Sequence, residues 1–238
     1  MQISGKLALV TGGTDGIGLE IARQLRALGA TVIVCGRRQE KLDQAAAEGL
    51  EALSADLSTV AGVDGLVAAL KARPLDIVIN NAGAGEEFFL DKDIDLDLND
   101  RIIFLNLNAP MRLAALLVPQ LRTRPEAALV NVTSGLAIAP SQNASYCATK
   151  AALRSFTMSI RAQLKDSNIA VIEALPPLVE TAMTSHRAGA KMTPVECARQ
   201  IVAGIARGKT QINVGQVKLL SFIFGLSPRL AQSVMMRF

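Results

Sequence analysis

The stretch Leu7-Ala8-Leu9-Val10-Thr11-Gly12-Gly13-Thr14-Asp15-Gly16-Ile17-Gly18 decides the fold of this 238-residue chain. Its four apolar residues predict a buried strand, and a helix-patterned segment, 19–28, follows the glycines. Glycine permits a tight turn, and the amides at a helix N-terminus attract negative charge. The glycine spacing differs from G-x-G-x-x-G, but a strand, a glycine-rich turn and a helix in this order still predict a loop that binds the phosphates of a dinucleotide.

Apolar strands and helical segments alternate along the rest of the chain. This alternation predicts an α/β fold of the Rossmann type, a doubly wound parallel sheet of about seven strands with helices on both faces. The expected strands lie near 7–11, 31–35, 51–54, 75–80, 127–133, 169–175 and 211–214.

No linker, repeat or low-complexity tract divides the sequence, so a single domain is expected over residues 1–238. Within it, we expect about 1–135 to bind the dinucleotide and about 136–215 to carry the catalytic residues and a substrate lid. The remaining segment, 216–238, is an apolar and basic tail.

The single tyrosine of the chain, Tyr146, lies four residues before Lys150. Residues at i and i+4 share one face of a helix, so the ammonium group can approach the phenol. A nearby positive charge favours the phenolate and lowers its pKa from an ordinary value of about 10. The spacing predicts a proton-transfer pair. The structural alternative is a half-buried tyrosine beside a lysine in solvent.

The glycine loop and the Tyr146–Lys150 pair together resemble the short-chain dehydrogenase/reductase family. Three more segments carry the resemblance, which covers roughly Lys6 to Thr184. They are Asn80-Asn81-Ala82-Gly83 after an apolar strand, Asn106 in Phe104-Leu105-Asn106-Leu107-Asn108, and Asn131-Val132-Thr133-Ser134-Gly135 at a strand end. The segments Ser134-Gly135-Leu136-Ala137, Gln163-Leu164-Lys165-Asp166 and Leu175-Pro176-Pro177 resemble the branch named for D-alanine esterification of teichoic acids.

This resemblance implies an oxidoreductase that transfers a hydride between a nicotinamide dinucleotide and a small carbonyl or secondary-alcohol substrate, which we expect to be hydrophobic. It implies that Tyr146 is the general acid or base, that Lys150 holds the nicotinamide ribose, and that Ser134 donates to the substrate oxygen. It also implies that Asn106 anchors a water connecting Lys150 to solvent. Ser134 precedes Tyr146 by twelve residues, one fewer than the family pattern, so Thr133 is an alternative source of the hydroxyl. A catalytically idle dinucleotide sensor or scaffold is the alternative function.

The end of the second expected strand predicts the choice of cofactor. An acidic residue there would bind a free ribose 2′-hydroxyl, whereas arginine accommodates a 2′-phosphate. The chain has Gly36 followed by Arg37 and Arg38, so NADP(H) is favoured over NAD(H). Two observations weaken this preference: Asp15 stands where many NADP-preferring relatives carry a basic residue, and the two arginines also suit a solvated helix start.

The complete set of expected cofactor-binding residues combines the glycine loop, the ends of the next strands, the catalytic pair and the loop after the sixth strand. It comprises Gly12, Thr14, Asp15, Gly16, Ile17, Gly18, Arg37, Arg38, Asp56, Leu57, Asn80, Ala82, Gly83, Tyr146, Lys150, Pro176, Val179 and Thr181.

Composition argues against several other classes of protein. Three cysteines with no paired spacing fit a reducing compartment, so a cytoplasmic location is expected. His186 is the only histidine, and the aspartates between 91 and 97 lack the glycine and closing glutamate of a calcium loop. No metal site is therefore expected. Aromatic residues make up 3% of the chain, which leaves little for stacking on nucleic-acid bases.

Charge and hydropathy single out the end of the chain. The net charge is +4, but from Cys197 onward there is no acidic residue, and the basic ones are Arg199, Arg207, Lys209, Lys218, Arg229 and Arg237. The apolar run 219–226 is shorter than the ~20 residues of a membrane span. Leu230, Val234 and Phe238 recur every fourth residue, as in an amphipathic helix.

A pocket wall or a subunit contact is the favoured interpretation of this tail, and peripheral docking on an anionic membrane surface is the alternative. The family resemblance further implies a homodimer or homotetramer that pairs through the helices carrying Asn106 and Tyr146.

Overall fold

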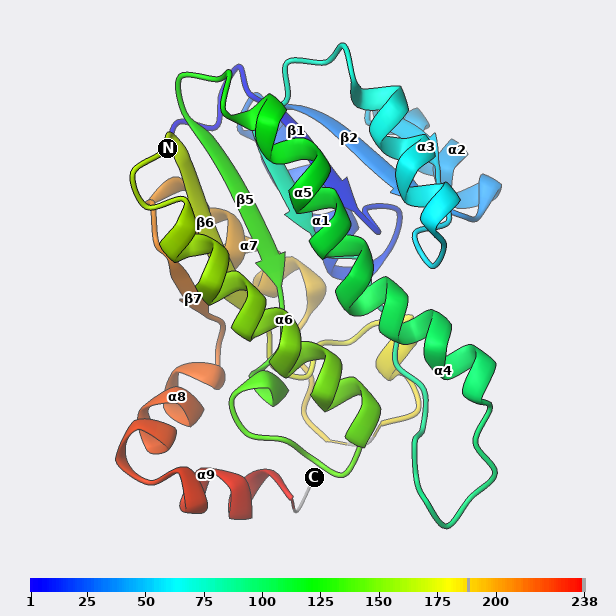
Figure 1. Cartoon of the computed structure of the whole chain (residues 1–238), viewed down its shortest axis with the longest axis vertical. Helices are drawn as coiled ribbons and strands as arrows, with labels where there is room; N and C mark the ends of the chain where they lie inside the picture. The colour runs from blue at the N-terminus through cyan, green and yellow to red at the C-terminus, as the bar shows by residue number, and fades with distance from the viewer. Residues whose placement is uncertain (188, 237–238) are drawn as a thin grey trace.

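Seven parallel strands form one sheet in the order β3-β2-β1-β4-β5-β6-β7 (Figure 1). The computed structural model describes residues 1–187 and 189–236, so Ala188 of the expected lid, and Arg237 and Phe238 of the tail, lie outside the described residues. The strands are β1 (Leu7–Thr11), β2 (Thr31–Gly36), β3 (Glu51–Ser54), β4 (Ile77–Asn80), β5 (Ala127–Val132), β6 (Ile169–Leu175) and β7 (Gln211–Asn213). The predicted Rossmann-type sheet is confirmed, with β4 beginning two residues later than expected.

Helices connect the strands and cover both faces of the sheet (Figure 1). One face is covered by α1 (Gly16–Ala27), α2 (Gln39–Ala47) and α7 (Pro194–Ala206), and the other by α3 (Val60–Leu70), α5 (Ala109–Leu121) and α6 (Ala144–Gln163). The remaining helices are α4 (Leu96–Ile103), α8 (Val217–Leu226), α9 (Pro228–Met235), the π-helical η1 (Phe104–Asn108) and the 3₁₀ turns η2 (Gly135–Ala137) and η3 (Ala182–Thr184).

The pleat of β1 explains the two layers of core. Ala8 and Val10 pack against α1 and α7, whereas Leu7 and Leu9 point to the opposite face and pack against α3 and α5. Successive side chains of a strand point to opposite faces, so a run that is apolar at every position belongs between two helical layers. The run Leu7–Val10 is buried throughout.

The chain reverses its winding direction between β1 and β4. From β1 it crosses to α1 on one face, and from β4 it passes through α4 to α5 on the other. In open α/β sheets, ligands bind at such a switch point, outside the carboxyl ends of the strands. This topology places the candidate site at the ends of β1, β2, β4 and β5.

One long helical segment, Leu96–Leu121, combines α4, η1 and α5. Within the described part of the chain it is the one helix long and apolar enough to cross a membrane, by length and composition alone. Leu113, Leu117 and Leu121 are buried against the sheet, so core packing accounts for its apolar face. Its first turn is capped by Asp95, which accepts a hydrogen bond from the Leu98 amide at 2.9 Å.

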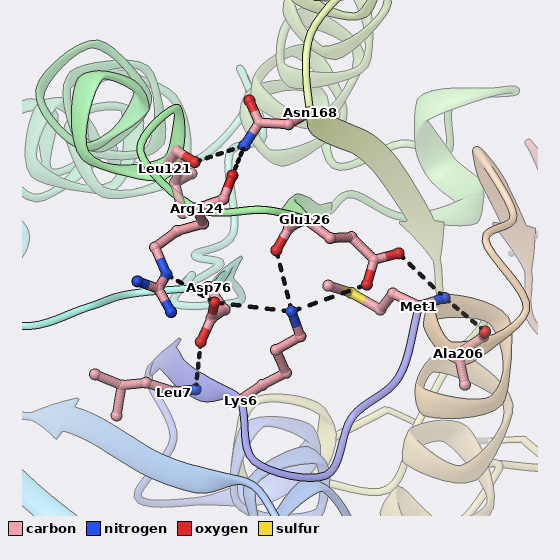
Figure 2. A network of polar contacts seen from close by, with 9 residues as sticks. All are labelled: Met1, Lys6, Leu7, Asp76, Leu121, Arg124, Glu126, Asn168 and Ala206. Carbon is pink, nitrogen blue, oxygen red and sulfur yellow. Dashed lines mark hydrogen bonds and ion pairs between the residues drawn. The ribbon is translucent and has the colours of Figure 1, made fainter.

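A polar network lies at the amino ends of the central strands, opposite the ends that carry the candidate site (Figure 2). The buried carboxylate of Asp76 accepts from the Leu7 amide and from Arg124 Nε, both at 2.9 Å. Lys6 lies 3.8 Å from the same carboxylate and 3.9 Å from Glu126. These contacts join the starts of β1, β4 and β5, so the ends that carry the site are held in fixed register.

Candidate active site

The glycine loop after β1 is bonded to the loop after β4. Thr11 Oγ1 accepts from the amides of Asn81 and Ala82, both at 3.0 Å, and Asn81 Nδ2 donates to the Thr11 carbonyl at 3.0 Å. Gly12 has a φ of +62°, and a Cβ at this position would lie 2.9 Å from Ala82 Cα. Only glycine allows the two loops to approach this closely.

A pocket of about 390 Å³ lies between these loops and the end of β2. Small-molecule sites span roughly 300–1,000 Å³, so the pocket is of ordinary size for a ligand. Nine of the expected cofactor-binding residues line it, namely Gly12, Thr14, Asp15, Arg37, Arg38, Asp56, Leu57, Ala82 and Gly83. Gly36, expected at the position that selects the cofactor, also lines the pocket, whereas Cys35, Ala55 and Leu105 were not predicted from the sequence.

Gly36 occupies the position at which an acidic residue would select NAD(H). A Cβ on Gly36 would lie 2.6 Å from Thr14 Oγ1 and 3.1 Å from Thr14 Cγ2. An aspartate could be accommodated here only if Thr14 moved. The absence of a carboxylate at residue 36 is therefore coupled to the packing of the glycine loop.

Both arginines after β2 are paired with carboxylates of the same pocket. Arg38 Nη2 lies 2.6 Å from Asp15 Oδ2, and Arg37 Nη1 lies 3.8 Å from Asp56 Oδ1. The arginine side chains are 64% and 62% exposed, so each pair contributes only about 0–1 kcal/mol and can be exchanged for a phosphate. Asp15 also caps α1 by accepting from the Gly16 amide at 2.8 Å.

Asp56 is an ionised anchor of this pocket. Burial disfavours its charge, but hydrogen bonds from Ser58 and the nearby guanidinium groups of Arg37 and Arg101 outweigh that effect and lower its pKa. Asp56 Oδ1 accepts from the Ser58 hydroxyl at 2.7 Å.

Tyr146 lies in the first turn of α6, next to the end of β5. Its side chain is half-buried, and burial of the hydroxyl raises the pKa to about 12, while the nearby Ser134 side chain acts in the opposite direction. The expected net lowering of this pKa is not found, because the loss of solvent outweighs the favourable neighbours. The phenol is therefore fully protonated at neutral pH.

Lys150 is buried, with 4% of its surface exposed. Its ammonium group donates to the Val132 carbonyl at 3.0 Å and lies 5.8 Å from the centre of the Tyr146 ring. Burial lowers the pKa of Lys150 to about 8. The alternative of a lysine in solvent is thus wrong, and the i, i+4 placement on one helix face is as expected.

The structure distinguishes the two candidate hydroxyls at the end of β5. Thr133 Oγ1 donates to Glu173 Oε1 at 2.8 Å and is buried. Glu173 is itself fully buried and is paired with Arg154 Nη1 at 2.6 Å. The Thr133 hydroxyl is therefore occupied by its hydrogen bond to a buried carboxylate. Ser134 is the hydroxyl that lies beside Tyr146.

Asn106 lies in the π-helical segment η1 and holds the loop after β4. Its Nδ2 donates to the Ala84 carbonyl at 2.8 Å, and its Oδ1 accepts from the Ala84 amide at 2.9 Å. A Cβ on Gly83 would lie 3.1 Å from Asn106 Oδ1 and 3.4 Å from Lys150 Nζ. Gly83 thus lies between the two side chains, and the water-anchoring role of Asn106 stays a prediction.

Other expected cofactor-binding residues lie around the pocket in different ways. Thr181 reaches the glycine loop, because a Cβ on Gly16 would lie 3.1 Å from Thr181 Cγ2. Pro176 accepts from the Gly135 amide at 2.9 Å through its carbonyl. Ile17 and Gly18 form the start of α1.

Two expected residues direct their side chains elsewhere. The Asn80 amide is buried and donates to Asn131 Oδ1 at 2.8 Å. The Val179 side chain is buried in the core, so only its backbone could face a ligand.

Two further residues contact the first turn of α6 and were missed from the sequence. Asn143 caps α6, accepting from the Tyr146 amide at 3.4 Å and donating to the Glu86 carbonyl at 2.9 Å. Gly85 lies against the phenol, since a Cβ there would be 3.3 Å from Tyr146 Cδ2. An asparagine three residues before the tyrosine is an N-cap signal that could have identified the first.

The pocket residues fit a dinucleotide. Gly12 forms the tight turn, the N-terminus of α1 faces the same opening, and Arg37 and Asp56 line its far end. A doubly wound sheet with this pocket, and with a serine, a tyrosine and a lysine beside it, defines a class of dinucleotide-dependent oxidoreductases.

Comparison with known proteins identifies the family. The sequence model of the short chain dehydrogenase family matches residues 6–191, and the chain belongs to that family. It is 36% identical over 230 residues to the uncharacterized oxidoreductase DltE of Bacillus subtilis, a match that covers 92% of this chain and 91% of that protein. The predicted resemblance to the D-alanine teichoic acid branch is thereby confirmed.

Two solved structures carry the fold with a bound nicotinamide dinucleotide. A short-chain dehydrogenase from Sphingobium yanoikuyae in complex with NADPH is 27% identical, with a TM-score of 0.81 and coverage of 87% of each chain. The 3-ketoacyl-(acyl-carrier-protein) reductase from Brucella melitensis complexed with NADH is 28% identical, with a TM-score of 0.78 and coverage of 85% of this chain and 91% of that one. The chain is thus an oxidoreductase with a nicotinamide dinucleotide cofactor.

Proposed function

We propose that the chain catalyses NADP(H)-dependent reduction of a carbonyl group, or oxidation of the corresponding secondary alcohol, on a small hydrophobic substrate. One observation carries the proposal. Ser134 and Tyr146 lie side by side at the end of β5, and Lys150 is buried one helical turn further along α6. A buried lysine costs stability, so its presence at this place favours a chemical role.

When bound, the nicotinamide supplies or accepts the hydride. Tyr146, protonated at neutral pH, donates the proton that the carbonyl oxygen needs on reduction. The Ser134 hydroxyl donates to the same oxygen, where negative charge develops. Lys150 holds a positive charge beside the phenol at neutral pH, because its pKa is about 8. That charge favours the phenolate left after proton transfer.

The preference for NADP(H) is supported by the end of β2. Gly36 carries no carboxylate, and the exposed guanidinium groups of Arg37 and Arg38 line the pocket. A phosphate can accept bidentate hydrogen bonds from such a group. The NADPH complex of one structural relative agrees with this choice, whereas the NADH complex of the other shows that the fold accepts both cofactors.

The apolar character of the substrate is supported by the side chains around the tyrosine. Met183 of the lid approaches Gly85, which lies against the Tyr146 ring. Val217 and Leu220 pack around Gly135, next to Ser134. A substrate that reaches Tyr146 would meet these apolar groups first.

Two further properties belong to the same proposal. We infer that the protein is cytoplasmic, which its three buried free cysteines support. We also infer a homodimer or homotetramer that pairs through the helical segment of Asn106, which continues into α5, and through α6. Met111 and Leu116 on α5 and Met158 on α6 are exposed apolar side chains on these helices.

A panel of ketones and aldehydes at matched NADPH and NADH concentrations tests the activity. We expect oxidation of NADPH with at least one apolar carbonyl compound, at a higher kcat/KM than with NADH. Tight NADPH binding without turnover on any member would favour the alternative of a dinucleotide sensor. Equal or better efficiency with NADH would contradict the cofactor assignment.

A further inference from the structure

The C-terminal helices α8 and α9 form a hairpin that the proposed reaction does not require. Figure 1 places it at the end of the molecule toward which the strands point. Among the described residues of the two helices, Val217 and Ala231 are the buried ones. The hairpin is therefore attached to the domain by a small part of its surface.

The outer side of this hairpin carries an exposed apolar stripe. On α8, Leu219, Phe222 and Leu226 recur at helical spacing and are 62%, 65% and 73% exposed. On α9, Leu230 and Val234 share one helix face at i, i+4 spacing and are 55% and 38% exposed, and we include them in the stripe. Single exposed apolar side chains are ordinary, but several on one small hairpin mark a surface that another body covers.

The favoured expectation of a pocket wall holds for only one side of α8. Val217 and Leu220 face inward and pack with Ile138 and Leu175. The stripe of Leu219, Phe222 and Leu226 points away from this cluster and is exposed. It cannot line a pocket in the same chain.

Charge decides between two bodies that could cover the stripe, a second copy of the chain and a lipid surface. Lys218 and Arg229 are exposed next to the stripe, and no aspartate or glutamate occurs after Glu196. Two copies joined through their hairpins would bring four cations together without a counter-charge, which disfavours a second copy. A surface of anionic lipid headgroups would attract the same cations while its acyl chains accept the apolar side chains.

We propose that the α8–α9 hairpin docks this protein on an anionic lipid surface, with the stripe from Leu219 to Val234 buried at the headgroup boundary. The hairpin adjoins the catalytic segment, because Gln142 Nε2 donates to the Met236 carbonyl at 3.4 Å. Docking would bring the mouth of the site close to the membrane. The loop before α4, which carries Asp91, Asp93 and Asp95, lies at the same end of the molecule but on the side away from the hairpin (Figure 1). We therefore expect the molecule to tilt onto the hairpin.

Vesicle co-sedimentation of the full chain tests the proposal. We expect binding to vesicles of phosphatidylglycerol mixed with phosphatidylcholine, weakened by salt, and little binding to phosphatidylcholine alone. Phe222→Glu and Leu226→Glu should each lower the partition coefficient at least about tenfold, which corresponds to about 1.4 kcal/mol. Replacing both Lys218 and Arg229 with Gln should lower it at least about fivefold.

Leu28→Glu is the matched control, because Leu28 is an exposed leucine, 49% exposed, at the far end of α1. It should leave vesicle binding unchanged. Native protein that stays in the supernatant, or that binds both kinds of vesicle equally, would overturn the proposal. A particle mass of Phe222→Glu below that of the native protein, measured without vesicles, would also overturn the proposal. It would mean that a second copy of the chain covers the stripe. None of these results bears on the proposed reaction, which is tested separately as cofactor oxidation with a water-soluble aldehyde.

Discussion

Lys150 is an amine whose burial costs stability at neutral pH. Its pKa in the folded chain is about 8, against about 10.4 for an exposed lysine. Between these values the unfolded chain binds more protons than the folded chain, so the free energy of unfolding rises with pH. The contribution is lost again as pH falls through the folded value.

Replacing Lys150 with Met removes this dependence. We expect wild type to gain roughly 2–3 kcal/mol relative to Lys150→Met between about pH 7 and pH 10.5. Urea unfolding of both proteins at several pH values measures the difference. Tyr146 is present in both, so its own titration cancels. Identical pH dependence of the two proteins would mean that Lys150 is not a buried, pKa-shifted amine.

Arg37 and Asp15 contribute opposite charges to the pocket. A charge-assisted hydrogen bond is worth about 1.5–3 kcal/mol, so Arg37→Ala should raise the KM for NADPH at least about tenfold and leave that for NADH nearly unchanged. Asp15→Asn should lower the KM for NADPH, because it removes a carboxylate yet retains an acceptor for the Gly16 amide. Steady-state kinetics with both cofactors measures these effects.

Lys41→Ala is the control for the arginine variant, because Lys41 is a basic residue of α2 outside the pocket lining. It should change neither KM. An equal loss for NADPH and NADH in Arg37→Ala would show that the residue does not recognise a 2′-phosphate.

At the scale of single elements, α6 has one side turned toward the sheet and one side turned outward. Tyr146, Lys150 and Arg154 recur every fourth residue and reach toward β5 and β6, where Lys150 contacts Val132 and Arg154 contacts Glu173. A shallow hollow on the same helix is lined by Ala151, Arg154, Ser155, Met158 and Ser159. We propose that this outer face takes part in the inferred subunit contact.

Met158→Glu tests that proposal. A buried carboxylate at an apolar contact is costly, so we expect the variant to dissociate into smaller particles that still unfold cooperatively. Analytical ultracentrifugation gives the mass, and Leu28→Glu, at the end of α1, serves as the control. A native protein that is already monomeric would contradict the inferred oligomer.

The sequence predicted the elements with regular patterns better than the contacts between them. Apolar runs located the strands, since full burial demands apolar residues on both faces. The i, i+4 spacing located Tyr146 and Lys150, but not the balance of burial and charge that raises the pKa of the phenol. The choice of Ser134 over Thr133 depended on Glu173, forty residues away in the chain, which no local pattern indicates.

At the scale of the whole molecule, loops from distant parts of the chain meet at the carboxyl ends of the strands. Thr11 joins the glycine loop to residues 81 and 82, Asn106 fixes Ala84, and Asn143 ties α6 to Glu86. At the amino ends of the strands, the network around Asp76 joins β1, β4 and β5. The proposed reaction depends on this convergence, since the serine, tyrosine and lysine act only if they lie beside the same cofactor.

Replacement of Tyr146 with Phe is the most direct test of that claim. The phenol contributes its proton to the reaction, while the pocket formed by the glycine loop and Arg37 is untouched. We predict that turnover falls at least about a hundredfold, the lower limit of a general acid's contribution, with NADPH affinity unchanged. A Tyr146→Phe variant that still reduced the carbonyl substrate at the wild-type rate would contradict the account.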